Sequence, residues 1–167
     1  MMNIQDVHLI FDYNYWANKR ILNAAEKVSQ EQFVASADFP HASLHGTVLH
    51  TLDAEYGWRM LCEHGLETED LQESEFPTVS SLQNRWHEEE TAMRAYLATL
   101  KDNRLSDVIR YTTPAGIKRE RVLWHCLYHV VNHGTQHRSE AAALLTGFNQ
   151  SPGDFDFSIF TIENKLS

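Results

Sequence analysis

Four long stretches of this chain carry apolar residues at helical spacing, and this pattern limits the fold more than any other feature. The stretches cover roughly residues 4–27, 43–64, 78–101 and 119–147. In the first stretch the recurring apolar positions are Ile4, Val7, Phe11, Trp16 and Ile21. Helices of this length bury their apolar faces by packing against one another. The sequence therefore predicts an all-α fold, a four-helix bundle with an up-and-down or crossover topology.

Capping residues mark several ends of these helices. Ser43 is a candidate N-cap of the second helix, and Gly65 is a candidate stop for it. Ser80 or Ser81 is a candidate N-cap of the third helix, whose stretch SLQNRWHEEETAMRAYLATL contains neither Gly nor Pro. The fourth helix is expected to end at Gly147.

Three other segments differ in composition from the helices. The acidic residues 66–80 are expected to form a solvated loop. Residues 107–122 contain the strand-favouring IRYTT, the turn signal PAG and the second strand candidate IKRERV, which predicts a short hairpin or an extended crossover before the last helix. The tail SPGDFDFSIFTIENKL is expected to pack across the bundle, because apolar residues alternate at Phe155, Phe157 and Ile159.

The size and charge of the chain exclude several classes of protein. Its 167 residues predict a single domain, residues 1–167. The 23 acidic and 14 basic residues give a formal net charge of -9, which argues against a protein that tracks nucleic-acid phosphates. The N-terminus lacks the pattern of a signal peptide, and no apolar run approaches the roughly 20 residues needed to cross a bilayer. We therefore expect a cytoplasmic protein with no nucleic-acid partner and no membrane contact.

Four histidines follow one another at four-residue intervals in the last helix: His125, His129, His133 and His137. Each four-residue step turns the side chain by about 40°, so the first and last of them cannot meet at one ion. The apolar face of this helix is centred on Val130. His137 lies about 20° from that direction, His133 about 60°, His129 about 100° and His125 about 140°. We therefore expect the last two to point into the bundle, His129 to lie on the shoulder, and His125 to be solvated.

Two inward histidines at positions i and i+4 can converge on a metal ion, although this HxxxH spacing alone is weak evidence. A single buried histidine is most often hydrogen-bonded and inert. His50 of the second helix is the best candidate for a third ligand, because it shares an inward stripe with Ala54, Gly57 and Leu61. Asp53 can orient its imidazole as metal-bound histidines usually require, or it is a solvated helix carboxylate.

The remaining histidines and several aromatic residues have less specific roles. The histidines outside this set are expected on the surface: His8, His41, His45, His64 and His87. Three aromatic side chains are pocket candidates, with core packing as the alternative: Tyr13, Trp16 and Trp58.

Three neutral histidines without a fourth protein ligand describe an open site. Such a site suits a divalent transition metal, with Zn²⁺ or Ni²⁺ the first choices. The metal lowers the pKa of a bound water or thiol to a range useful near neutral pH. This electrostatic argument permits hydrolysis as well as thiol transfer.

An ordered set of motifs resembles the DinB/YfiT-like family, named after a DNA-damage-inducible member. These motifs are FDYNYWANKRIL, SLHGTVLHTLDAEYGWRMLCEHG, FPTVSSLQNRWHEEETAMRAYL, HVVNHGTQHR and PGDFDFSIF. The resemblance implies a four-helix bundle, often a homodimer, with a metal site at His50, His133 and His137. Its related members include transferases and isomerases that depend on small bacterial thiols. One departure is Ser139-Glu140, where the family usually has Gly-Gln; Glu140 is expected to tune the site or a dimer contact.

Two functions of different classes are compatible with these residues. The leading hypothesis is a metal-dependent transferase that activates a low-molecular-weight thiol towards a small electrophile, with a metal-dependent hydrolase as its enzymatic variant. The alternative is a non-catalytic, dimeric stress-response or binding module in which a structural metal joins the second and fourth helices. A fourth protein ligand, for instance His129 or Asp53, favours the second hypothesis.

Overall fold

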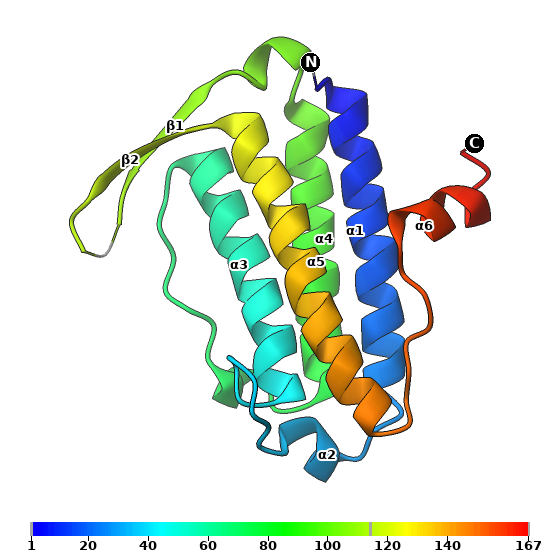
Figure 1. Ribbon diagram of the computed structural model, residues 1–167. Coiled ribbons are helices and arrows are strands. Elements are labelled where there is room, and N and C mark those ends of the chain that lie inside the picture. The colour runs from blue at the N-terminus through cyan, green and yellow to red at the C-terminus, as the bar shows by residue number, and fades with distance from the viewer. Residues whose placement is uncertain (1, 114, 167) are drawn as a thin grey trace.

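The computed structural model of the protein, which describes residues 2–113 and 115–166, shows four long helices side by side (Figure 1). These helices are α1 (Ile4–Ala25), α3 (Leu44–His64), α4 (Val79–Thr99) and α5 (Leu123–Gly147). α5 packs against α1 and α3, and α4 contacts the same two helices from the other side. The prediction of an all-α four-helix bundle is therefore confirmed. Among the described residues, no helix is both long enough and apolar enough to cross a membrane.

The ends of α3 follow the predicted capping residues, whereas the start of α4 does not. The Ser43 side chain accepts a hydrogen bond from a backbone N–H in the first turn of α3. Gly65 ends this helix in the left-handed conformation, with φ of 68°. The prediction for α4 was wrong, because the side chain of Thr78 is the N-cap, and it accepts a hydrogen bond from the Ser81 N–H at 3.1 Å. An N-cap needs extended backbone geometry, which Thr78 has and which Ser80 and Ser81, already inside the helix, do not.

The short helix α2 (Gln30–Val34) lies at one end of the bundle (Figure 1). The sequence pattern did not predict it. Ser29 and Gln32 form a capping box around its first turn. Its Phe33 side chain is 1% exposed and packs against the core. Two single 3-10 turns, η1 (Glu73–Glu75) and η2 (Asp102–Arg104), interrupt the remaining loops.

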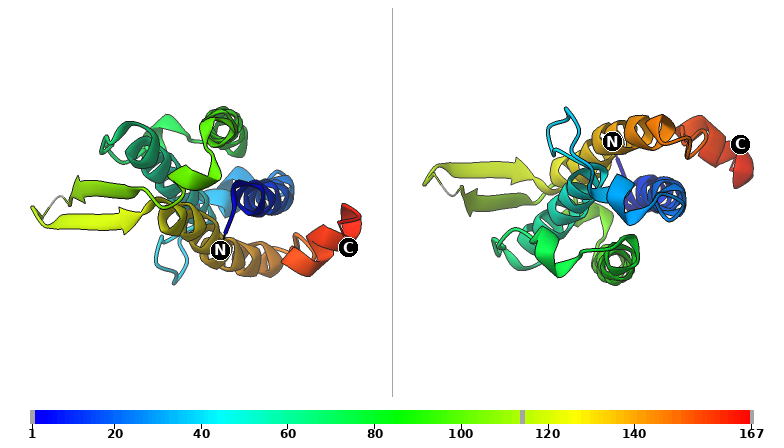
Figure 2. Two further views of the ribbon diagram at one scale, coloured as in Figure 1. Left: turned by 90° about the horizontal axis from the view of Figure 1, so that it is seen from above. Right: turned by 90° about the horizontal axis from the view of Figure 1, so that it is seen from below.

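The predicted hairpin is present and consists of β1 (Val108–Thr112) and β2 (Lys118–Val122) in antiparallel pairing. It projects from the bundle on the side opposite to the C-terminal segment (Figure 2). Part of the predicted turn, Pro114, lies outside the described residues. Because residues 118–122 pair with β1, α5 begins at Leu123 rather than near residue 119.

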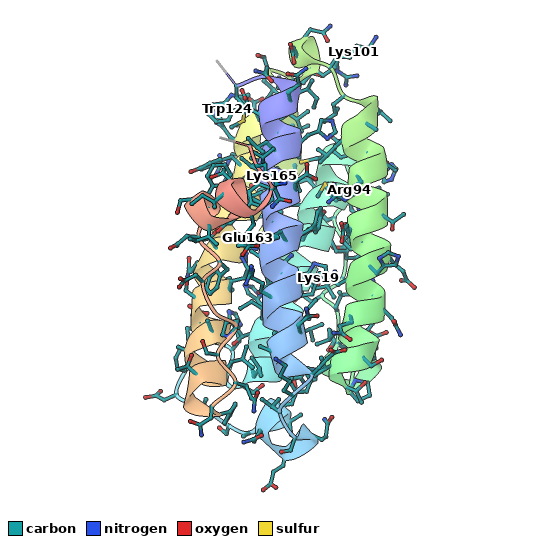
Figure 3. All side chains as sticks on the ribbon, turned by 90° about the vertical axis from the view of Figure 1, so that its right-hand side faces the viewer. Lys19, Arg94, Lys101, Trp124, Glu163 and Lys165 are labelled. Atoms are coloured by element: carbon teal, nitrogen blue, oxygen red, sulfur yellow. The ribbon has the colours of Figure 1, made fainter. Side chains whose placement is uncertain are left out.

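The C-terminal tail packs across the bundle as a helix rather than with strand-like alternation. This helix, α6 (Phe157–Glu163), crosses α1 on the face shown in Figure 3. Phe160 is buried with its ring centroid 5.9 Å from that of Tyr13 and 5.6 Å from that of Trp16. Arg20 of α1 pairs with Glu163 at 2.6 Å. The buried residue of α6 is Phe160, which follows the alternating positions Phe155, Phe157 and Ile159.

The interior has two apolar clusters with a layer of buried polar residues between them. The apolar clusters occupy the two ends of the bundle. The polar layer contains Asn14 and Asn18 of α1, Glu55 and Arg59 of α3, Glu89 of α4 and Arg138 of α5. Each of these side chains is at most 8% exposed. Buried polar groups at this density need partners, because an unpaired one costs on the order of 1–3 kcal/mol.

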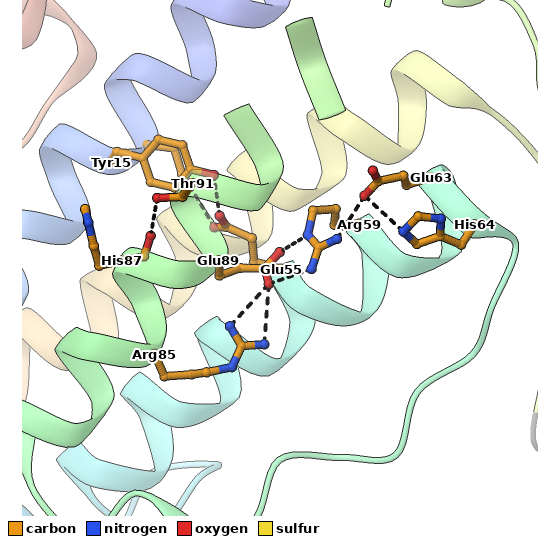
Figure 4. A network of polar contacts seen from close by, with 10 residues as sticks. Tyr15, Glu55, Arg59, Glu63, His64, Arg85, His87, Glu89 and Thr91 are labelled. Carbon is orange, nitrogen blue, oxygen red and sulfur yellow. Dashed lines mark hydrogen bonds and ion pairs between the residues drawn. The ribbon is translucent and has the colours of Figure 1, made fainter. Parts of the chain in front are cut away.

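Two connected networks satisfy much of this polar layer. In one, Glu55 accepts hydrogen bonds from the Tyr15 hydroxyl at 2.6 Å and from Asn14 Nδ2 at 3.0 Å. Arg138 Nη1 donates to Asn14 at 2.6 Å and to Asn18 at 2.7 Å. In the other, Arg59 of α3 pairs with Glu89 of α4, and Glu89 also contacts Arg85 of its own helix (Figure 4).

Candidate metal centre

The exposure of the four α5 histidines follows the order that helical geometry predicts. His137 is only 5% exposed, and His133 is half-buried. His129 and His125 are exposed. The pair nearest the apolar direction of the helix therefore faces α3, as expected.

The Nε2 atoms of His50, His133 and His137 lie together between α3 and α5. His50 Nε2 is 3.3 Å from His133 Nε2, and His133 Nε2 is 3.1 Å from His137 Nε2. Two imidazole nitrogens bound to one Zn²⁺ lie about 2.9 Å apart at a right angle and about 3.4 Å apart at the tetrahedral angle. Both observed separations fall inside this range.

The environment keeps the imidazoles of His50 and His133 uncharged at neutral pH. Burial, together with His41 and His137, lowers the pKa of His50 to about 4. Burial, followed by His137 and His50, also lowers the pKa of His133 to about 4. A neutral imidazole has a free lone pair on one ring nitrogen, which is the form that binds a metal ion.

Glu140 fixes the orientation of His137. Its Oε2 lies 2.7 Å from His137 Nδ1, so the Nδ1–H donates to this carboxylate. That contact leaves Nε2 with its lone pair facing the other two histidines. The orienting carboxylate comes from the same helix, three residues after the histidine that it contacts.

A bound cation would satisfy the three facing nitrogens better than hydrogen bonds among them. His133 Nε2 has two imidazole neighbours but carries at most one proton, so it can donate to only one of them. A divalent ion accepts a lone pair from all three nitrogens. The donor set, three imidazoles with one ring held by a carboxylate, suits Zn²⁺, Ni²⁺ or a similar metal.

Asp53 does not take the orienting role predicted for it. Its carboxylate accepts a hydrogen bond from the Leu71 N–H at 2.8 Å. This contact ties the loop that follows α3 back against that helix. Asp53 points to the loop because its position, three residues after His50, turns it by about 60° around α3.

Two histidines assigned to the surface were placed wrongly. His45 is 3% exposed, and its Nε2 lies 2.8 Å from the Phe76 carbonyl oxygen. His41 is half-buried, and it forms a group with His50 and His137 in which the ligating atoms all lie within 4.8 Å of one another. This is a three-histidine group that can hold a metal ion. His41 precedes α3, so no helical periodicity indicated its direction.

A cavity of about 260 Å³ lies along α3, between that helix, the following loop and β1. Its lining residues are Asp53, Ala54, Gly57, Trp58, Leu61, Glu67, Thr68, Asp70, Tyr111 and Thr113. The Trp58 ring contacts His129 with centroids 5.1 Å apart, and His129 is 5.5 Å from His133. A chain of ring contacts therefore runs from Trp58 in the cavity wall through His129, the shoulder residue, to His133.

The other two aromatic pocket candidates lie elsewhere. Tyr13 packs against α6, and Trp16 lines a larger hollow of about 710 Å³. Most residues that line this hollow belong to α1 and α4. These two helices lie across the bundle from the contact between α3 and α5 (Figure 2). Tyr13 and Trp16 are therefore remote from the histidine group, and Trp58 is the one of the three that lies beside it.

Comparison with known proteins places these features in a family. The sequence profile of the DinB family matches residues 1–162. The chain belongs to the DinB family. It is also similar to Protein DinB from Bacillus subtilis (strain 168), with 23% identity over 165 residues, which covers 93% of this chain and 95% of that protein. The DinB family assignment and the three-histidine group together fit a metal-binding protein.

Within this DinB family chain, the unusual Ser139-Glu140 pair now has a structural role. The Ser139 hydroxyl donates to the Thr135 carbonyl oxygen at 2.9 Å and stays on the exposed side of α5. Two roles were expected for Glu140, one at the site and one at a dimer contact. Its direct contact with His137 supports the role at the site.

Proposed function

We propose that this DinB family protein is a metal-dependent enzyme in which His50, His133 and His137 hold one divalent transition metal, Zn²⁺ or Ni²⁺. The observation that carries the proposal is the position of His133 Nε2, which lies 3.3 Å from His50 Nε2 and 3.1 Å from His137 Nε2. The neutral state of the His50 and His133 imidazoles and the contact of Glu140 with His137 support it. A bound ion of this kind lowers the pKa of a thiol or water that occupies an open coordination position.

We further propose that the reaction is the transfer of a low-molecular-weight thiol to a small electrophile. The 260 Å³ cavity along α3, the helix that carries His50, has room for a small organic molecule. The rings of Trp58 and Tyr111, with centroids 6.1 Å apart, offer apolar contact area to this substrate. Metal-dependent hydrolysis is the variant in which water replaces the thiol.

The alternative is a non-catalytic, dimeric stress-response or binding module whose metal joins α3 to α5. The observation in its favour is the position of His41, a fourth imidazole beside the other three. In this case the ion stabilises the bundle and no exogenous ligand reaches it.

Metal content tests the proposal directly. Protein purified without an affinity tag is expected to contain about one transition metal ion per chain. His133→Ala is expected to lose most of it, because His133 Nε2 is the nitrogen that lies within 3.3 Å of both His50 Nε2 and His137 Nε2. Metal analysis by mass spectrometry after dialysis provides the measurement. His125→Ala is the matched control, since His125 lies on the same helix but is exposed, and it should keep the metal. Full metal content in His133→Ala would falsify the assignment.

A second measurement separates the enzyme from the structural module. With Co²⁺ in the site, a small thiol is expected to change the visible spectrum, because a sulfur ligand enters the coordination sphere. The same thiol is expected to be conjugated to an electrophile by the wild-type protein and not by His133→Ala. If thiols leave the Co²⁺ spectrum unchanged and no conjugate forms, the result contradicts the thiol-transferase proposal and favours the non-catalytic module.

A further inference from the structure

A histidine from the loop before α3 lies against the three-histidine site. The His41 ring stacks on the His50 ring, with centroids 3.8 Å apart and an angle of 17° between the planes. It meets the His137 ring edge-on at a centroid distance of 5.0 Å. The ligating atoms of these three residues lie within 4.8 Å of one another.

The backbone around His41 is held in an unusual conformation. Ala42 has φ of 59°, in the left-handed region that residues with a side chain rarely adopt. The Ala42 carbonyl oxygen accepts a hydrogen bond from the Ala37 N–H at 2.7 Å, which closes the loop. Strained residues of this kind persist only where surrounding contacts hold them, and they cluster at functional sites.

Gly46 allows this loop to lie against the first turn of α3. A Cβ atom at position 46 would be 2.2 Å from the His41 carbonyl oxygen, a distance that real atoms do not reach. The close approach brings the His41 backbone next to the helix that carries His50. Ser43, the N-cap of α3, fixes where the loop ends and the helix begins.

We propose that His41 is a fourth histidine ligand of the metal, and that it takes one of the coordination positions left open by His50, His133 and His137. The inference rests on the proposed metal site and adds a ligand to it. The ligating atoms now lie within 4.8 Å of one another, and tetrahedral ligands are separated by roughly 3.4 Å, so the proposal requires only a short shift of the His41 side chain towards the ion.

A loop ligand gives the site two states. In a tetrahedral Zn²⁺ site, His41 would fill the fourth position, and four histidines would close the coordination sphere, as in a structural zinc site. With His41 released, that position would be open to an exogenous ligand. A small thiol would then have to displace His41 from the zinc, so this residue would control access to the ion.

X-ray absorption of the Zn²⁺-loaded full chain tests the proposal by counting histidine ligands. Wild type is expected to show four imidazoles per zinc, and His41→Ala and His41→Phe are expected to show three. Zinc affinity, measured by competition with a chromophoric chelator, is expected to fall about tenfold or more in both variants. His41→Phe is the informative variant, because its ring preserves the stack on His50 but has no nitrogen. Gly46→Ala, which displaces the loop without changing a ligand, is expected to lower the count to three.

Each contrary result has a distinct meaning. Three imidazoles in zinc-loaded wild type, with unchanged affinity in His41→Phe, overturns the role of His41 and leaves the proposed metal site intact. A loss of affinity in His41→Ala that His41→Phe restores also overturns it, because stacking alone then explains the effect. A wild-type chain that binds no zinc overturns both proposals.

Discussion

Replacing Glu89 with Ala is expected to lower the free energy of unfolding by about 3 kcal/mol, at the lower end of the range for breaking a buried ion pair. Glu89 is 0% exposed and pairs with Arg59, itself 8% exposed, through two hydrogen bonds (Figure 4). Its removal leaves a buried guanidinium with a single carboxylate partner, Glu63 at 2.9 Å. That remaining contact keeps the loss from reaching the upper end of the range.

Urea unfolding followed by circular dichroism measures this loss. Glu90→Ala is the matched control, because Glu90 is the next residue of α4 and pairs with Arg94 at 2.8 Å near the surface. Such a pair contributes at most about 1 kcal/mol. Equal losses in Glu89→Ala and Glu90→Ala would show that the buried ion pair adds nothing beyond a surface one.

The buried carboxyl group of Glu55 is expected to make the stability of the protein fall as the pH rises from about 4.5 to about 7. Burial raises the pKa of Glu55 from its ordinary 4.5 to about 7, against the opposing hydrogen bond from Tyr15. Because the folded chain keeps this proton where the unfolded chain has lost it, folding is favoured below pH about 4.5, and the advantage disappears above pH about 7. A difference of this size corresponds to about 3 kcal/mol.

Glu55→Gln removes the ionisation and isolates its effect. The free energy of unfolding of wild type and variant should be measured by urea titration at several values between pH 4.5 and 8. The variant is expected to lack the decrease of about 3 kcal/mol that Glu55 adds in wild type. The histidines titrate in both proteins, so the difference between the two curves reports Glu55. Parallel curves over this range would rule out a raised pKa at this carboxyl group.

Helical geometry was enough to order the α5 histidines. The turn of about 100° per residue ranks the four side chains by direction, and the exposures of His137, His133, His129 and His125 follow that rank. The same reasoning proposed His50, whose Nε2 lies 3.3 Å from that of His133 on α5. Periodicity works for these positions because the helices are long and straight enough to keep one face inward.

Features that depend on loops were beyond this reasoning. His41 reaches the site through a left-handed residue, Ala42, and through a backbone approach that only Gly46 permits. Neither the left-handed conformation of Ala42 nor the close approach at Gly46 follows from a repeating pattern in the sequence. The start of α5 was placed too early for a related reason, since pairing with β1 overrides helix propensity at residues 118–122. Glu140 was recognised as unusual, but its contact with His137 required the side-chain positions.

The order of the histidines along the chain decides when during synthesis an ion can be captured. His50 and His133 are separated by 83 positions, yet their ring nitrogens are 3.3 Å apart. A nascent chain that has produced α1, α3 and α4 holds only the early histidines, and the pair on α5 emerges last. With the proposed site, metal uptake would therefore be a late event that requires α5, the final long helix, to have docked. Loss of the proposed ion is expected to weaken first the contact between α5 and α3, the two helices that carry its ligands.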